Sequence, residues 1–123
     1  MIQSFKDLKA WQLAMKVAVG VYEVTKKFPK DEQFGLTNQL RRASVSISSN
    51  IAEGFGRNNT KEKDQFYGIA YGSLLEVESQ IILAVELGFL HSSKATKELF
   101  ENIVETQKVL SGLKKANKKE RRV

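Results

Sequence analysis

The hydrophobic residues of this chain recur every three or four positions along nearly its whole length, which is the spacing of one face of an α-helix. No stretch has the strict alternation of apolar and polar residues that a half-buried β-strand needs. The helical pattern is interrupted at three places, namely around Pro29, from Gly54 to Thr60 and from Gly88 to Ser93. The sequence therefore predicts four helices joined by short turns.

The first two helices meet at Pro29, the single proline of the chain. Proline fixes φ and lacks a backbone donor, so it ends a first helix over residues 5–28 and can open the second helix. Asp31 and Glu32 then stand at the positive end of the second helix dipole, where carboxylates are stabilising. We predict that this second helix ends at Gly54.

The third helix is predicted over residues 61–87, with Asn59 or Thr60 as its cap and Gly88 behind its last turn. A serine of the following turn, Ser92 or Ser93, caps the fourth helix. The fourth helix has a narrow seam of bundle packing with spacings of four and three residues. Its members are Leu99, Ile103, Thr106, Leu110 and Leu113.

Four amphipathic helices joined by short turns pack as antiparallel neighbours. We therefore predict an all-α, up-down-up-down four-helix bundle over residues 1–115. A chain of 123 residues is large enough to bury one hydrophobic core. The apolar pattern dissolves beyond Lys114, and we expect residues 116–123 to be a basic, disordered C-terminal tail.

The first helix has a wider apolar arc than a surface helix needs. One stripe of this arc consists of Leu8, Trp11, Met15, Ala18 and Tyr22, and the adjoining stripe consists of Ala14, Val17, Val21, Val24 and Phe28. Either the helix is deeply buried within its own bundle, or one stripe faces a second subunit. The periodicity leaves both interpretations open.

The second helix combines an apolar stripe with four serines. The stripe consists of Leu36, Leu40, Ala43, Ile47 and Ile51. Serine is a mediocre helix former, so four of them indicate a face where another helix comes close or where polar groups find partners. We predict a structural polar network between the second and third helices. Its members are Arg42, Asn50, Glu53 and Glu76.

The composition narrows the compartment and the kind of chemistry. The chain has no cysteine, so disulfides and thiolate metal sites are excluded and a reducing, cytoplasmic location is expected. An apolar run from Leu13 to Val24 is interrupted by Lys16 and Glu23. We interpret this run as part of an amphipathic helix, and we expect neither a signal peptide nor a membrane span.

The formal net charge of +6 is unevenly distributed. Residues 1–107 contain thirteen Lys and Arg and thirteen Asp and Glu, whereas residues 108–123 contain seven Lys and Arg against Glu120 alone. Clustered cations attract the phosphates of nucleic acids. The candidate nucleic-acid-binding residues are Arg41, Arg42, Arg57, Lys61, Lys63, Lys114, Lys115, Lys118, Lys119, Arg121 and Arg122.

The motifs of common enzyme classes are absent from the sequence. His91 is the only histidine, and no Glu-x-x-His pair of a di-iron bundle occurs. The glycine-containing loop from Gly54 to Lys61 lacks the second glycine directly before Lys-Ser/Thr that a nucleotide P-loop needs. We therefore expect no catalytic residue, no cofactor and no metal, and at most a backbone-phosphate contact at this loop.

The pattern resembles the bacterial four-helix bundle family of 23S rRNA intervening-sequence proteins, over nearly the whole chain to about residue 115. The motifs that carry this resemblance are Phe5-x-x-Leu8-x-x-Trp11, the run from Phe34 to Gly54, Gly56-Arg57, Ala70-x-Gly72-Ser73-x-x-Glu76 and Leu87-Gly88-Phe89-Leu90.

The resemblance implies a small cytoplasmic bundle that assembles into a ring-like homopentamer and has no established enzymatic activity. The chain is also similar to the accessory variability determinant of diversity-generating retroelements, a basic pentamer that works with a reverse transcriptase and nucleic acid. A non-enzymatic accessory protein that binds RNA or DNA as a homo-oligomer is therefore implied. The alternative is a structural oligomer or protein-interaction module that binds no nucleic acid.

Overall fold

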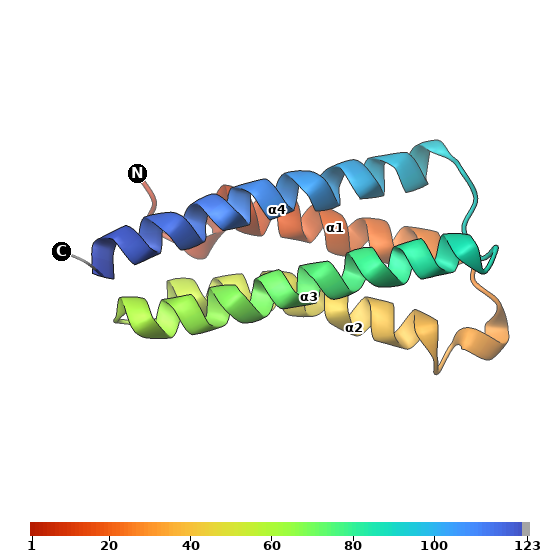
Figure 1. Ribbon diagram of the computed structural model, residues 1–123, viewed down its shortest axis with the longest axis horizontal. Helices are drawn as coiled ribbons and strands as arrows, with labels where there is room; N and C mark the ends of the chain where they lie inside the picture. Colours follow the sequence, from red (N-terminus) through yellow and green to blue (C-terminus); the bar gives the residue numbers. More distant parts are fainter. Residues whose placement is uncertain (122–123) are drawn as a thin grey trace.

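The computed structural model describes residues 1–121 and, among them, four α-helices, two short 3-10 helices and no strand (Figure 1). α1 and α3 begin at the same end of the bundle, and α2 and α4 begin at the other end. The all-helical prediction is thus confirmed. The elements are η1 (Phe5–Asp7), α1 (Lys9–Thr25), η2 (Lys30–Glu32), α2 (Leu36–Phe55), α3 (Thr60–Glu86) and α4 (Lys94–Arg121).

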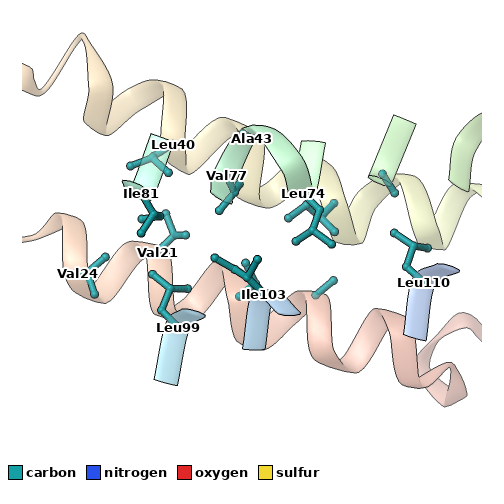
Figure 2. Packing of buried hydrophobic residues seen from close by; sticks show 14 of the residues in the cluster. Val21, Val24, Leu40, Ala43, Leu74, Val77, Ile81, Leu99, Ile103 and Leu110 are labelled. Atoms are coloured by element: carbon teal, nitrogen blue, oxygen red, sulfur yellow. The ribbon is translucent and has the colours of Figure 1, made fainter. Parts of the chain in front are cut away.

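The hydrophobic core lies between the four helices and receives side chains from each of them (Figure 2). Fully burying one aliphatic side chain is worth about 1.5 to 3 kcal/mol, so this core is the main source of stability. The predicted stripe of α2 is buried throughout, and the seam of α4 is buried as far as Leu110. The largest fully buried apolar side chains are Val17, Val21, Leu40, Ile47, Ile51, Leu74, Val77, Ile81, Leu99, Ile103 and Leu110.

The first helix is shorter than predicted at both ends. Ser4 and Asp7 form a capping box at the start of η1. Leu8 follows η1 in an extended conformation with φ −73° and ψ 125°, so η1 is a separate turn before α1. α1 ends at Thr25, whose hydroxyl donates to the carbonyl of Val21 at 2.7 Å. The apolar pattern runs unbroken through these turns because their apolar side chains also reach the core.

The predicted opening of the second helix at Pro29 is wrong. Pro29 stands before the short helix η2, and α2 begins only at Leu36. The carboxylate of Glu32 accepts a hydrogen bond from the backbone N–H of Leu36 at 3.1 Å, so Glu32 satisfies one of the first donors of α2. α2 extends one residue beyond the predicted end at Gly54.

Both ends of α3 lie within one residue of their predicted positions. The Asn59 side chain accepts from the N–H of Glu62 at 2.8 Å and caps the first turn. Gly88 adopts φ +80°, and the N–H of Phe89 donates to the carbonyl of Ala84 at 2.9 Å. This is a Schellman ending, which requires the left-handed conformation that glycine tolerates best.

The spacing of apolar residues along α3 predicts an inner stripe of Phe66, Ala70, Leu74, Val77, Ile81 and Val85, and the structure differs from this stripe at its two ends. The central residues from Ala70 to Ile81 are buried as expected, but Val85 is 41% exposed and Phe66 is only partly buried. Tyr67 and Ala84 occupy the core in their place. Because apolar residues surround much of this helix, their spacing alone did not fix its rotation about its own axis.

By length and composition alone, α3 is the one described helix that is apolar enough to cross a membrane. Its most apolar 18-residue window has a mean hydropathy of 1.3, and 28% of that window is buried. This criterion is weak evidence for a membrane span, because the core helix of a bundle satisfies it as well. The low buried fraction nevertheless means that much of the apolar surface of α3 faces outwards.

The last helix continues where we expected a disordered tail. α4 extends to Arg121, and Asn117 is only 5% exposed. Its side-chain amide donates to the carbonyl of Thr60 at 2.9 Å. Asn117 thus prolongs the seam of α4 with a polar residue, which an apolar pattern does not reveal. Residues 122 and 123 lie outside the described residues.

Candidate nucleic-acid interface

Three separate parts of the chain meet at one end of the bundle, which we call the basic end (Figure 1). It consists of residues 1–9, residues 53–64 around the turn between α2 and α3, and residues 114–121 of α4. These segments contain ten Lys and Arg against five Asp and Glu. Because the net charge of the chain is +6, most of its excess positive charge lies at this end.

Close packing between α2 and α3 forms the floor of the basic end. A Cβ added at Gly54 would stand 2.7 Å from the ring of Tyr67 and 3.0 Å from the Cβ of Phe66. Only glycine therefore lets the last turn of α2 approach the first turns of α3 this closely. Tyr67 is 2% exposed, and burial raises the pKa of its phenol above the ordinary value of 10.0. The negative charge of the Glu120 carboxylate raises this pKa further.

The turn between α2 and α3 presents three candidate cations in different environments. The guanidinium of Arg57 lies 4.5 Å from the ring centroid of Phe66 and 3.7 Å from the carboxylate of Glu53. The ammonium of Lys63 donates to the carbonyl of Phe55 at 2.7 Å, and it therefore caps the negative end of α2. Lys61 is exposed and forms no such contact.

The end of α4 presents its lysines outwards. The ammonium of Lys114 lies 4.9 Å from the ring centroid of Tyr71, a cation–π geometry that holds this side chain against α3. Lys115, Lys118 and Lys119 are exposed, and Lys115 and Lys119 lie on the side of α4 opposite the buried Asn117. Lys61 is exposed at this end as well, and so are Lys6 and Lys9 near the N-terminus, so all of these lysines are accessible to a phosphate.

Arg41 and Arg42 lie on α2 away from the basic end. The Nε of Arg41 donates to the hydroxyl of Thr25 at 2.9 Å, and its guanidinium lies 4.7 Å from the ring centroid of Tyr22. Arg41 therefore joins α2 to α1. Arg42 is exposed on a groove of about 340 Å³ between α2 and α3, which Glu76 also lines. Sequence reasoning grouped these arginines with the other cations, whereas the structure separates them.

The predicted polar network has different pairings in the structure. Asn50 donates to the carbonyl of Ser46 at 2.8 Å, and the hydroxyls of Ser46 and Ser73 lie 2.9 Å apart across α2 and α3. Glu53 pairs with Arg57 and not with a residue of α3. Within residues 1–121, none of the ion pairs joins Arg42 to Glu76. The serine hydroxyls, which are short enough for this close approach, form a direct hydrogen bond between the two helices.

The turn between α3 and α4 holds His91, which is exposed. Its carbonyl accepts from the hydroxyl of Thr96 at 2.9 Å, and the Ser93 side chain accepts from the N–H of Thr96 at 3.2 Å. The predicted serine cap is thus Ser93. Among residues 1–121, no three or more His, Cys, Asp or Glu side chains group as metal ligands would.

The match to known families covers most of the bundle. The sequence profile of the 23S rRNA-intervening sequence protein family matches residues 6–112. The chain belongs to this family. The matched range ends before the last turns of α4, so the lysines beyond residue 112 that contribute to the basic end lie outside it. No curated protein sequence matches the chain.

Proposed function

We propose that this family member is a non-enzymatic accessory protein that binds the phosphate backbone of RNA through its basic end. The observation that carries this proposal is the convergence of cations from three distant parts of the sequence on one end of the bundle. Lys61, Lys115, Lys118 and Lys119 are the residues to which we assign the contacts, since they are exposed there. Clustered cations of this kind bind phosphates and release condensed counterions.

The other candidate cations have supporting roles in this proposal. Arg57 and Lys114 are held over aromatic rings, so they add positive charge at fixed positions. Their side chains therefore lose little conformational entropy when RNA binds. Lys63 acts on the carbonyls of α2 and contributes mainly to the fold. We place the protein in the cytoplasm, where RNA is available.

We further propose that the protein acts as a homo-oligomer, a ring-like pentamer, as the family resemblance implies. Large apolar side chains on the outer faces of α1 and α3 support this, because Val19 is 59% exposed, Ile69 is 53% exposed and Ile82 is 49% exposed. Such groups of exposed aliphatic residues are typical of protein interfaces. The same observation favours the second candidate function, a structural oligomer or protein-interaction module without nucleic-acid binding.

Removing charge without removing the helix separates these two functions. The triple variant K115Q/K118Q/K119Q should weaken binding to a structured RNA hairpin, measured by fluorescence anisotropy over a range of salt concentrations. The slope of log K against log salt should become shallower by about 0.9 for each duplex phosphate contact that is lost. Far-ultraviolet circular dichroism checks that α4 remains helical.

A matched control removes three lysines from the opposite end of the bundle. The variant K27Q/K30Q/K97Q lowers the net charge by the same amount, and it should keep the wild-type salt slope because its lysines lie far from the basic end. Equal losses in both triple variants would mean that only net charge matters and would contradict a localised site. Wild-type protein that binds neither RNA nor DNA at low salt would favour the structural module.

A further inference from the structure

A pocket of about 490 Å³ lies among the turns at the end of the bundle opposite the basic end (Figure 1). Its walls come from the end of α1, the turn at Pro29, the turn between α3 and α4, and the first turn of α4. Small-molecule sites in proteins have volumes of about 300 to 1,000 Å³, so this pocket has the size of a ligand site. We call it the turn pocket.

The floor of the turn pocket is apolar and belongs to the hydrophobic core. Val24 is 6% exposed and Leu90 is 8% exposed, and Phe89 is partly buried beside them. The ring of Phe89 lies 5.7 Å from the ring of Phe28, which anchors Phe89 to the core. A ligand with an apolar group is stabilised on this floor, because the group leaves water when it binds.

Contacts within the chain hold the walls of the turn pocket in place. The hydroxyl of Thr96 donates to the carbonyl of His91 at 2.9 Å, and the hydroxyl of Ser93 donates to that of Thr96 at 3.1 Å. On the opposite wall, the ring of Pro29 fixes the backbone φ. Because these walls are preformed, a ligand has few protein groups to order when it binds.

The rim of the turn pocket favours an anion. Lys27 lines the pocket, and it takes part in none of the ion pairs found within residues 1–121. Glu23 is the only carboxylate among the described residues of the lining, and it lies 3.3 Å from the ammonium of Lys26. The imidazole of His91 is exposed on the rim and has no hydrogen-bond partner within residues 1–121. The rim therefore offers one ammonium group and one imidazole N–H donor.

We propose that the turn pocket binds a small monocarboxylate with an apolar body. The apolar body lies on the floor of Val24, Phe89 and Leu90, and the carboxylate meets the ammonium of Lys27 and the imidazole N–H of His91. One carboxylate matches these two donors, whereas a phosphate dianion would bring unmatched charge to an apolar floor. The turn pocket is separate from the basic end, so this proposal does not depend on RNA binding.

Hydrocinnamate is a suitable probe, because it joins a phenyl ring to one carboxylate through a short chain. Isothermal titration calorimetry of the full-length protein should show one hydrocinnamate bound per chain. In nuclear magnetic resonance spectra, the probe should shift the backbone amide signals of Gly88, His91 and Ala95, which line the pocket. Hydrocinnamamide has the same body without the charge, and it should bind at least about tenfold more weakly. Acetate and inorganic phosphate, which lack the apolar body, should not bind detectably.

Three variants at exposed positions assign the contacts. Lys27→Gln should weaken hydrocinnamate binding by about tenfold and leave hydrocinnamamide binding unchanged, because it removes only the charge. Ala95→Leu places a larger side chain in the pocket and should weaken the binding of both probes. Lys30→Gln is the matched control, since Lys30 is an exposed lysine of the same end that does not line the pocket. It should keep the wild-type affinity, and thermal unfolding checks that each variant is folded.

Several results would overturn the proposal. Equal affinities for the acid and the amide, or equal affinities of wild type and Lys27→Gln for the acid, would show that the pocket does not recognise the carboxylate. Amide shifts confined to Lys115 and Lys118 would mean that the carboxylate only meets the excess cations of the basic end. If neither probe bound at millimolar concentration, the turn pocket would not be a site for apolar carboxylates.

Discussion

The two ends of the bundle are built from the same kinds of parts and differ in charge and in packing. The basic end has ten Lys and Arg against five Asp and Glu, whereas residues 23–32 and 86–98 at the opposite end contain five of each. The opposite end is closed by apolar residues, with the rings of Phe28 and Phe89 at 5.7 Å. The two ends thus have the same number of carboxylates, which balance the cations at the opposite end and leave five cations in excess at the basic end.

This difference shows why a net charge has to be located before it is interpreted. Lys94 and Glu98 at the opposite end lie 4.0 Å apart and are both exposed, and such surface pairs contribute little to stability. At the basic end, by contrast, Lys63 contacts a backbone carbonyl and Lys114 contacts an aromatic ring. None of the ion pairs found within residues 1–121 includes an exposed lysine of this end. Packing at the basic end therefore fixes the positions of Lys63 and Lys114 and leaves the other lysines exposed.

The largest effect is expected from truncation after Leu113. It removes the hydrogen bond from Asn117 to Thr60 and the contact of Lys114 with Tyr71. We expect a loss of about 2 to 4 kcal/mol in the free energy of unfolding, from one buried hydrogen bond and one cation–π contact.

Urea denaturation of the truncated and full-length proteins measures this loss. The variant K115Q/K118Q/K119Q is the matched comparison, because it keeps Lys114 and Asn117 and should retain nearly all of the stability. Full stability after truncation would mean that the last turns of α4 carry charge only, as in a disordered tail, and the two ends would then differ in charge alone.

A smaller effect is expected from Gly54→Ala. The added methyl group would stand 2.7 Å from the Tyr67 ring, so α2 and α3 must move apart, at a typical cost of about 1 to 3 kcal/mol for overpacking. Gly112→Ala is the control, since its added Cβ meets nothing within 4 Å. It should stabilise α4 by up to about 1 kcal/mol, the usual gain in helix propensity.

Thermal unfolding of both glycine variants gives the comparison directly, as shifts of opposite sign. Because Gly54 lies at the base of the basic end, Gly54→Ala should also weaken RNA binding in proportion to the displacement of α3. Equal melting temperatures for the two variants would contradict the close approach of α2 and α3 at this end.

The smallest effect concerns the alkaline limit of stability. Burial and Glu120 raise the pKa of the Tyr67 phenol in the folded protein above its ordinary value of 10.0. As the pH rises, the phenol therefore loses its proton in the unfolded chain before it does so in the folded protein. The contribution of Tyr67 to the free energy of unfolding is complete below pH 10, and it declines as the pH rises through the pKa of the folded protein. Tyr67→Phe removes this decline.

Denaturation midpoints measured between about pH 9 and about pH 11 test this dependence, given the ordinary pKa values of tyrosine and lysine. The difference between the midpoints of wild type and Tyr67→Phe at each pH is the informative quantity. A Glu120→Gln variant should lie between them. Identical pH profiles for all three proteins would show that burial does not raise the pKa of the Tyr67 phenol.

Much of the fold follows from the sequence, because its determinants are local. The cap at Asn59 and the stop at Gly88 depend on a few neighbouring residues, and both are in place. The stripe of α2 and most of the seam of α4 follow from spacing within a single helix. The family was also indicated by motifs within short segments, and the matched range of residues 6–112 confirms it.

The rest was decided by contacts between distant segments. Periodicity could not say whether Phe66 or Tyr67 enters the core, since the choice depends on the space beside Gly54 on another helix. Asn117 extends α4 through a partner 57 positions away in the sequence. The candidate site divides in the same way: composition identified the cations, and tertiary packing gathered some at the basic end while it fixed Arg41 against α1. Charge is a property of residues, whereas a charged surface exists only once helices have been placed side by side.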